Sequence, residues 1–152
     1  MKKLLLLGVL VAALVSAVSQ EPSKERRVRE AIQSFYAAFN AHDFKDAAQF
    51  TTDDWTHINP LGGVTRGRDA VLGELKEVHS TFLKNVKDTP EDVSVTLATP
   101  DVAVATVVSR VSPFKTPDGV KHENEQHVRT FVLVNRHGRW LILQDQNTIR
   151  PR

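Results

Sequence analysis

The segment that decides the fold is Arg139-Trp140-Leu141-Ile142-Leu143-Gln144-Asp145-Gln146-Asn147-Thr148. Its first half alternates as a strand does, because Trp140 and Ile142 fall on one side and the leucines between and after them on the other. Four polar residues, 144–147, then follow without a Gly or Pro that would end the strand. A strand that changes from apolar to polar in this way leaves a core and enters a wet cavity or an interface. The segment therefore predicts a small α+β domain with a pocket.

The first nineteen residues have the features of a secretory signal peptide. Lys2 and Lys3 precede an apolar run over residues 4–15, and Ala17-Val18-Ser19 fits a cleavage site. The run is shorter than the roughly 20 apolar residues of a membrane-spanning helix, which makes a retained anchor the weaker alternative. We therefore expect a signal peptide over 1–19 and a single exported domain over 20–152. That domain would be periplasmic or secreted, without stable membrane insertion.

Charge and composition exclude several kinds of partner. The chain has 20 Lys and Arg and 18 Asp and Glu, so loss of Lys2 and Lys3 leaves a neutral domain. A neutral domain gives no electrostatic reason to expect nucleic acid. The chain has no Cys, which excludes thiolate chemistry and thiolate metal sites. Its six His show no metal-binding spacing, and no Gly-rich phosphate loop is present. We therefore expect neither a metal nor a cofactor; a metal site would require distant residues to converge.

Periodicity predicts helices first and strands afterwards. Residues 20–27 are polar and are expected to be frayed. Apolar spacings of three and four predict helices, and β-branched alternation between turn residues predicts strands. The expected helices cover 28–41, 44–50 and 69–83, and the expected strands cover 55–59, 93–97, 102–111, 125–134 and 139–148. This order predicts an α+β domain in which a curved antiparallel sheet packs on three N-terminal helices.

Three segments resemble a known family. They are residues 35–43 (Phe-Tyr-Ala-Ala-Phe-Asn-Ala-His-Asp), residues 50–55 (Phe-Thr-Thr-Asp-Asp-Trp) through Gly67-Arg68, and Gly138-Arg139-Trp140 through Gln146-Asn147-Thr148. Together they resemble the nuclear-transport-factor-2-like superfamily, its SnoaL-like group, and particularly the SgcJ/EcaC type. The resemblance implies a cone-shaped domain whose mouth is a ligand cavity. It leaves the activity open, because the superfamily includes isomerases, dehydratases, cyclases, epoxide hydrolases and non-catalytic modules.

The resemblance also allows one activity to be compared position by position. The ketosteroid-isomerase branch has an Asp base before a Pro, which corresponds here to Asn59. Its helix-1 Tyr corresponds to Phe35, and its second acid corresponds to Thr130 when the hairpins at Gly138 are aligned. None of these positions keeps the residue type that the branch uses, and an amide is not a general base. The resemblance therefore does not predict isomerase chemistry of that type.

Alternation and the resemblance together indicate a site. Trp55, His57 and Asn59 share one strand face, and the resemblance turns that face inward together with Asp145 and Asn147. His57 and Asp145 form the expected catalytic acid–base pair. The expected ligand-binding residues are Tyr36, Trp55, Asn59, Arg110, Thr130 and Asn147. The alternatives are that Asp145 and Asn147 only satisfy backbone groups, that His57 is a pocket wall, and that Arg110 pairs with an acid across the strands.

The opposite face of the sheet indicates a partner. In the same register, the side chains that point away from the cone are His127, Arg129, Phe131, Leu133, Gln144 and Gln146. A half-apolar outer face suits a homodimer. We therefore expect a small-molecule-binding domain for a hydrophobic, oxygenated ligand, and leave open whether it is an enzyme of isomerase, cyclase, dehydratase or hydrolase-like type. The alternative is a non-catalytic homodimeric association module.

Overall fold

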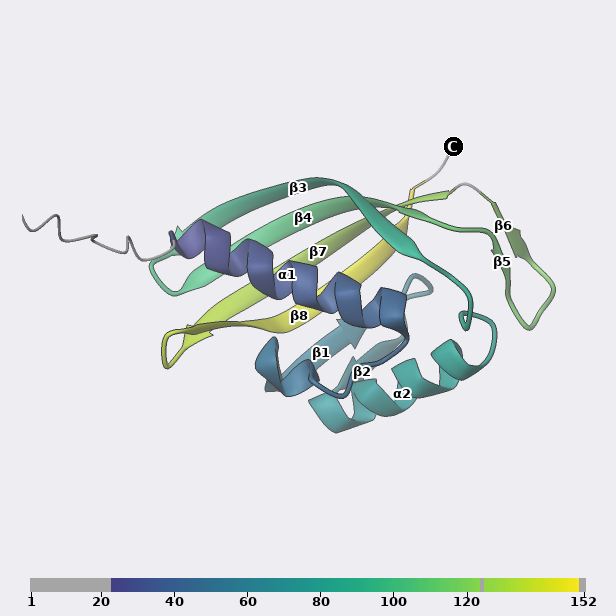
Figure 1. The fold of residues 1–152 in the computed structure, drawn as a ribbon, viewed down its shortest axis with the longest axis horizontal. Coiled ribbons are helices and arrows are strands. Elements are labelled where there is room, and N and C mark those ends of the chain that lie inside the picture. The colour runs from purple at the N-terminus through teal and green to yellow at the C-terminus, as the bar shows by residue number, and fades with distance from the viewer. Residues whose placement is uncertain (1–22, 124, 151–152) are drawn as a thin grey trace, which may run out of the picture.

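A computed structural model describes residues 23–123 and 125–150. It contains two α-helices, one 3₁₀ turn and eight strands: α1 Lys24–Ala41, η1 Ala47–Gln49, β1 Thr51–Ile58, β2 Val64–Arg66, α2 Arg68–Ser80, β3 Asp88–Thr99, β4 Val102–Val111, β5 Phe114–Lys115, β6 Lys121–His122, β7 Glu125–Arg136 and β8 Arg139–Ile149. Six strands form one curved sheet in the order β2-β1-β8-β7-β4-β3, and β5 and β6 form a separate hairpin (Figure 1). The predicted α+β class is confirmed.

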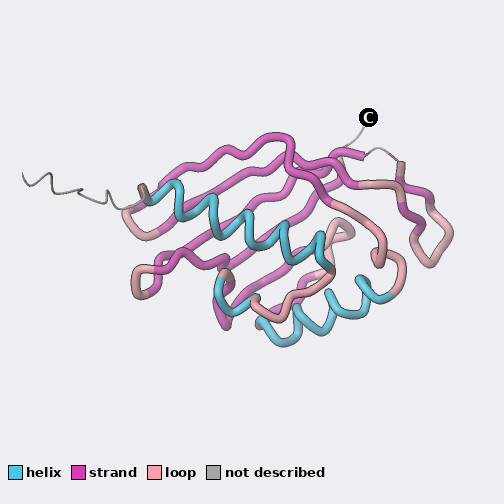
Figure 2. Tube along the Cα trace, viewed as in Figure 1, coloured by secondary structure: helices cyan, strands magenta, loops and turns pink. Residues whose placement is uncertain are grey.

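Both helices lie on the same side of the sheet. Figure 2 shows α1 following the long strands while α2 lies beside the short strands β1 and β2. The second of the three predicted helices, over 44–50, is wrong, since only the 3₁₀ turn forms there. Asp43, just before this turn, accepts a hydrogen bond from the N–H of Lys45. α1 also begins earlier than expected, because Ser23 caps it by accepting a hydrogen bond from the N–H of Arg26. Neither helix, within the described ranges, is long and apolar enough to cross a membrane.

The sheet is mixed rather than wholly antiparallel. β1 runs parallel to β8, whereas the pairs β8–β7, β7–β4 and β4–β3 are antiparallel. β1 begins at Thr51, four residues earlier than expected. Its register places His57 directly beside Asp145 of β8. Side chains of paired residues share a face, so this pairing brings two predicted site residues together.

A β-bulge in β8 determines which residues of β7 face the helices. Near the hairpin, Leu133 pairs with Ile142, but beyond the bulge Phe131 pairs with Asp145. Leu143 is the extra residue between these two registers, and it has no partner on β7. A single extra residue exchanges the two faces of the remaining strand relative to its partner. Trp140 and Asp145 therefore both point inward although their spacing is odd.

Because of the bulge, the residues on the outer face differ from those predicted. Without it, counting from the hairpin pairs Thr130 with Asp145 and turns Arg129 outward. In the structure Thr130 pairs with Gln146 on the exposed side, whereas Arg129 and His127 are buried. Phe131 and Leu133, expected at an outer interface, are likewise buried in the core. The predictions for these residues were wrong because simple alternation does not reveal a bulge.

The core is built around Phe35 of α1. Its ring makes edge-on contacts with four aromatic rings, those of Tyr36, Phe44, Trp55 and Phe131, at centroid distances of 5.3–6.3 Å. Such arrangements favour the electrostatics of the rings in addition to burying their surface. The aromatic cluster joins α1 to β1 and β7.

Adjacent substitutions on β7 test the bulged register. Phe131→Ala should lower the free energy of unfolding by about 3–5 kcal/mol, because it opens a cavity in the core. Thr130→Ala should change it by less than about 1 kcal/mol, since the side chain is exposed on the sheet. Urea unfolding measures both values. Equal effects, or the larger effect at Thr130, would contradict the register.

Candidate active site

The side chain of Asp145 is fully buried, and three neighbours hydrogen-bond to its carboxylate. Trp55 donates from Nε1 to Oδ1 at 2.9 Å. His57 places Nδ1 3.0 Å from Oδ2, and Arg129 donates from Nη1 to the same oxygen at 2.5 Å. Trp55 and His57 come from β1 and Arg129 from β7, so β8 is joined through this carboxylate to both of its sheet neighbours.

These partners keep the carboxyl group ionised. Burial alone would raise the pKa of Asp145, but the hydrogen bond and charge of His57, the charge of Arg129 and the Trp55 N–H outweigh it and lower the pKa. Burial likewise disfavours the charged guanidinium of Arg129, yet the charges of Asp145, Tyr36 and Asp88 raise its pKa above the ordinary value. The ring of Phe35 lies 4.9 Å from the guanidinium carbon and gives a further cation–π contact. A buried, ionised Asp145–Arg129 pair results.

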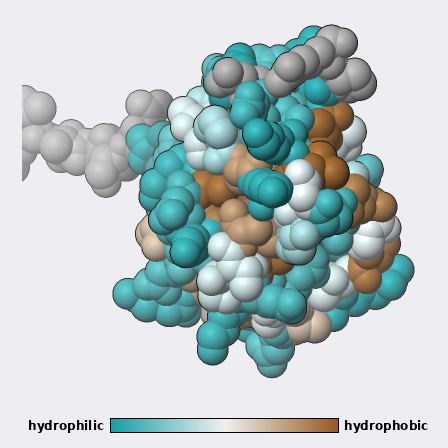
Figure 3. Space-filling view, turned by 90° about the vertical axis from the view of Figure 1, so that its right-hand side faces the viewer, coloured by the Kyte–Doolittle hydropathy of each residue, from teal (hydrophilic) through white to brown (hydrophobic). Residues whose placement is uncertain are grey.

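A cavity of about 210 Å³ lies between α1, α2, the sheet and the β5–β6 hairpin. Most of its walls are apolar, and they include Phe35, Phe39, Leu75, Val78, Phe82, Val111, Phe114 and Ile149. Its polar lining residues are His57, Asn59, Glu74, Thr116, His122, His127, Arg129 and Asn147. Figure 3, which faces the end of the molecule with the hairpin, shows apolar side chains gathered among hydrophilic ones. Such a cavity suits a compact ligand with an apolar body and a few hydrogen-bonding groups.

His57 presents one ring nitrogen to Asp145 and lines the cavity. Nδ1 faces the carboxylate of Asp145, which places the proton on that nitrogen. No other described residue forms a hydrogen bond with Nε2, and the ring lines the cavity. Nε2 can therefore accept a proton from a bound molecule, while Asp145 stabilises the imidazolium that forms. The arrangement is a carboxylate–imidazole pair beside an apolar chamber.

A second histidine on the cavity lining is held in its neutral form. Burial is the main cause that lowers the pKa of His127, and Arg129 lowers it further. Asn147 donates from Nδ2 to Nδ1 of His127 at 2.9 Å, which leaves the ring proton on Nε2. Asn147 pairs with Arg129 across β8 and β7. Asn147 and His127 thus form a fixed polar patch next to Arg129.

The structure brings together some of the sequence-predicted residues and separates others. His57, Asn59 and Asn147 line the cavity, and Asp145 lies directly behind His57. Asn59 also closes the β1–β2 turn, because its Oδ1 accepts hydrogen bonds from Leu61 and Gly63 N–H groups. The catalytic and binding roles assigned to these residues stay predictions.

The other four predicted ligand-binding residues do not line the cavity. Trp55 is fully buried and supports Asp145 from within the core. Tyr36 is buried against Phe131, and burial raises its pKa to about 12. Thr130 is exposed on the outer face because of the bulge. Arg110 is also exposed, and its Nε donates to Glu91 at 2.6 Å, which is the cross-strand pair considered as its alternative.

Arg129 and His127 also line the cavity, although simple alternation predicts them on the outer face. The sequence of β7 could have placed them correctly. His127 and Arg129 lie on the same face of the strand as Phe131 and Leu133, and large apolar side chains favour the core face. Among the residues of ranges 23–123 and 125–150, no group of three or more His, Asp or Glu side chains is arranged to hold a metal ion.

Comparisons with known proteins agree with this fold. Residues 28–148 match the SnoaL-like domain family. No curated protein sequence matches the chain. An uncharacterized protein with a cystatin-like fold from Caulobacter vibrioides superposes with a TM-score of 0.80 at 24% identity, covering 84% of this chain and 89% of that one.

Two further solved structures carry functional names. A candidate dehydratase of the NTF2-like family from Streptomyces avermitilis has a TM-score of 0.68 at 19% identity, covering 84% of this chain and 96% of its own. The CaMKII hub of S. rosetta also has a TM-score of 0.68, at 18% identity, and covers 85% of this chain and 99% of its own. At these identities the likeness shows the fold alone.

Removal of one charge from the buried Asp145–Arg129 pair should destabilise the folded protein. Arg129→Met keeps the length of the side chain but leaves Asp145 without its guanidinium, which should lower the free energy of unfolding by about 3–5 kcal/mol. Arg129→Met combined with Asp145→Leu should recover part of that loss, since no unpaired charge remains. Urea unfolding of the single and double variants measures both effects. A single variant as stable as the wild type would contradict the pair.

Proposed function

Because the chain belongs to the SnoaL-like domain family of the NTF2-like superfamily, we propose that it is an exported domain that binds a compact, hydrophobic, oxygen-bearing small molecule and transfers a proton on it. His57 is the acid–base group, Asp145 orients it, and Arg129 stabilises charge on the ligand oxygen. The observation that carries the proposal is the His57–Asp145 contact of 3.0 Å in the lining of a mostly apolar cavity.

The geometry supports a proton transfer for three reasons. The imidazole has one nitrogen fixed by a carboxylate and the other available to the cavity. The apolar walls keep water from competing and strengthen electrostatic interactions within the cavity. Arg129 lines the cavity and donates from Nη1 to Asp145, while its Nε has no hydrogen-bond partner among the described residues, so it has a further N–H group to offer an oxyanion.

These roles define two successive proton transfers. Nε2 of His57 takes a proton from a carbon next to a carbonyl, the electron pair moves to the carbonyl oxygen, and the resulting oxyanion accepts hydrogen bonds from Arg129. The imidazolium then returns the proton at another atom of the ligand. Isomerases, dehydratases and cyclases can all use such a step, and the candidate dehydratase among the similar structures is consistent with it.

A probe reaction tests the base without the natural substrate. 5-Nitrobenzisoxazole is a compact aromatic molecule whose ring opens when a base removes its ring proton, breaking the N–O bond and releasing a coloured phenolate. The wild type should accelerate this reaction, and His57→Gln should lower the rate at least about 100-fold, as expected for loss of a positioned base. His137→Gln, at an exposed histidine of the β7–β8 turn, is the matched control and should leave the rate unchanged.

Two outcomes contradict a base at His57. One is an equal rate for the wild type and His57→Gln. The other is a wild-type rate no faster than that of free imidazole at the same concentration. Circular dichroism of each variant establishes that a lost rate does not come from a lost fold.

The second candidate function is association, and the outer face of the sheet favours it. β4 and β7 pair Val104 with Val132 and Val108 with Val128 on this face, and Val104 is 37% exposed. These valines replace the buried Phe131 and Leu133 as the apolar part of the proposed homodimer interface. The similarity to the CaMKII hub of S. rosetta is consistent with an oligomer.

Sedimentation measures the proposed dimer. The wild type should be a homodimer at micromolar concentration, and Val104→Lys combined with Val128→Lys should make it a monomer, because two buried cations would face each other across the interface. Lys substitution at Leu61, an exposed residue on a loop away from these valines, is the control and should leave the dimer intact. A monomeric wild type would contradict the interface.

Export is supported by the sequence alone. Residues 1–19 lie outside the described residues, and the basic start, apolar run and cleavage site are the grounds for the proposal. N-terminal sequencing of exported protein should begin at Gln20, whereas a membrane-bound product that retains Lys2 would contradict export.

A further inference from the structure

A second cavity, of about 390 Å³, lies where the end of α1 meets α2. It shares Leu75 with the first cavity, so α2 forms part of the wall of both. Its lining residues are His42, Asp43, Phe44, Lys45, Leu72, Leu75, Lys76, His79 and Ser80. Apolar side chains therefore lie beside basic ones in one hollow.

Two histidines of this cavity share a hydrogen bond. Nδ1 of His42 lies 2.7 Å from Nδ1 of His79, so one proton lies between the two rings. His79 is only 6% exposed and packs against the rings of Phe39 and Phe44 at 4.5 and 5.4 Å. Nε2 of each histidine has no hydrogen-bond partner among the described residues. A buried N–H without a partner is costly, which indicates that a bound group completes the site.

The charges around the histidine pair are mostly positive. Lys45 and Lys76 line the cavity, and Lys87 at the start of β3 lowers the pKa of His42, after burial as the main cause. Burial lowers the pKa of His79 to about 4, and the charges of His42 and Arg129 contribute. Asp43 is the carboxylate of the lining, and it pairs with Lys45 at 3.2 Å. The pair therefore stays neutral at pH 7, and Lys76 is the cation of the lining that forms no ion pair with another described residue.

We propose that this second cavity binds a small apolar carboxylate, such as an aromatic acid of the size of benzoate. The hydrocarbon part would pack on Phe44, Leu72 and Leu75, and the carboxylate would accept hydrogen bonds from Lys76 and from the one Nε2–H that the neutral histidine pair carries. This site is separate from the His57 cavity and does not depend on the function proposed for it.

The histidines give the binding a defined pH dependence. In the empty site a second proton on the pair is disfavoured by burial and by the facing cations His42, Lys87 and Arg129. The negative charge of a bound carboxylate offsets the positive charge of that second proton, so binding raises the proton affinity of the histidine pair. By linkage, affinity for the carboxylate must increase as the pH falls from about 7.5 to about 5.5, where benzoate itself is still ionised.

A titration with sodium benzoate tests the site. Amide chemical shifts recorded by ¹H–¹⁵N NMR should change at residues 42–45 and 72–80, with an affinity at least about threefold tighter at pH 5.5 than at pH 7.5. Lys76→Glu should weaken binding at least about tenfold, since it reverses an exposed charge of the lining. His79→Phe keeps a ring between Phe39 and Phe44 and should remove the pH dependence.

Two controls separate this site from the first cavity. Benzyl alcohol has a similar apolar body without the charge and should bind at least about tenfold more weakly at residues 42–45 and 72–80. His57→Gln should leave the benzoate titration unchanged, so failure of the proposed base would not affect this result. Equal binding of the alcohol and the acid, an unaltered affinity in Lys76→Glu, or shifts confined to the lining of the first cavity would each overturn the proposal.

Discussion

The fold depends on the burial of one carboxylate. Asp145 has no contact with solvent, and an ionised carboxylate in such a place is stable only when its oxygens are fully hydrogen-bonded and a cation lies close by. Trp55, His57 and Arg129 meet that requirement. Because these partners come from both neighbouring strands, the requirement also holds β1, β8 and β7 in one register. The parallel pairing of β1 and the bulge at Leu143 are the geometric conditions for this arrangement.

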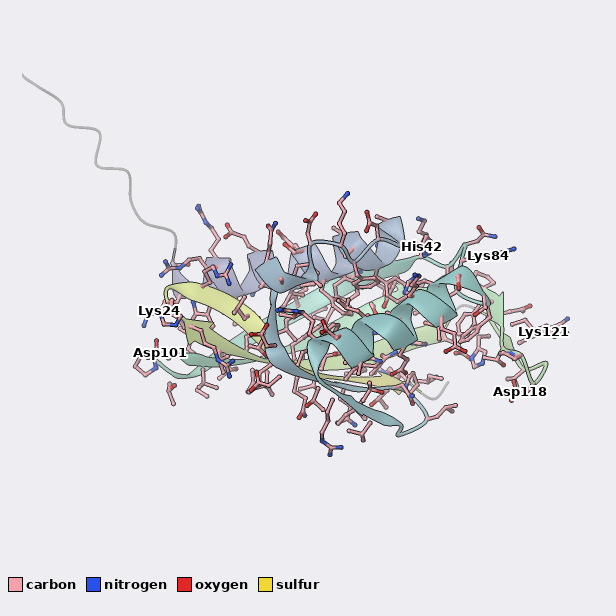
Figure 4. The ribbon with its side chains drawn as sticks, turned by 90° about the horizontal axis from the view of Figure 1, so that it is seen from below. Lys24, His42, Lys84, Asp101, Asp118 and Lys121 are labelled. Atoms are coloured by element: carbon pink, nitrogen blue, oxygen red, sulfur yellow. The ribbon has the colours of Figure 1, made fainter. Side chains whose placement is uncertain are left out.

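The same interaction prepares the candidate site. Asp145 holds Nδ1 of His57, which leaves Nε2 facing the cavity. Asp145 also pairs with Arg129, so the cavity is lined by a guanidinium whose charge is balanced. In the proposed function Asp145 therefore serves both stability and proton transfer, whereas substitution of His57 should affect proton transfer more than stability. Residues of α2 line both cavities. Figure 4 shows His42 of the second cavity at the end of α1, beside this helix.

The sequence was sufficient for the fold class and for part of the site. Helical periodicity before residue 84 and strand alternation after it determined an α+β domain, and alternation in β1 placed His57 and Asn59 on one face. The change from apolar to polar in β8 correctly indicated a strand that borders a cavity. Arg129 was not predictable in the same way, because one unpaired residue, Leu143, reversed the faces of β8 relative to β7. The exposed position of Thr130 has the same cause, whereas Tyr36 and Trp55 were buried by aromatic packing that pairwise spacing does not describe.

The state of Asp145 is the most direct test of this account. A ¹³C NMR titration of its carboxyl carbon in the wild type reports the ionisation of this single group. We expect Asp145 to stay ionised to a pH below its ordinary pKa of 3.8, because His57, Arg129 and Trp55 all favour the charged form. Protonation of Asp145 above pH 3.8 while the protein remains folded would show that burial outweighs these partners, and would contradict the proposed basis of both the fold and the site.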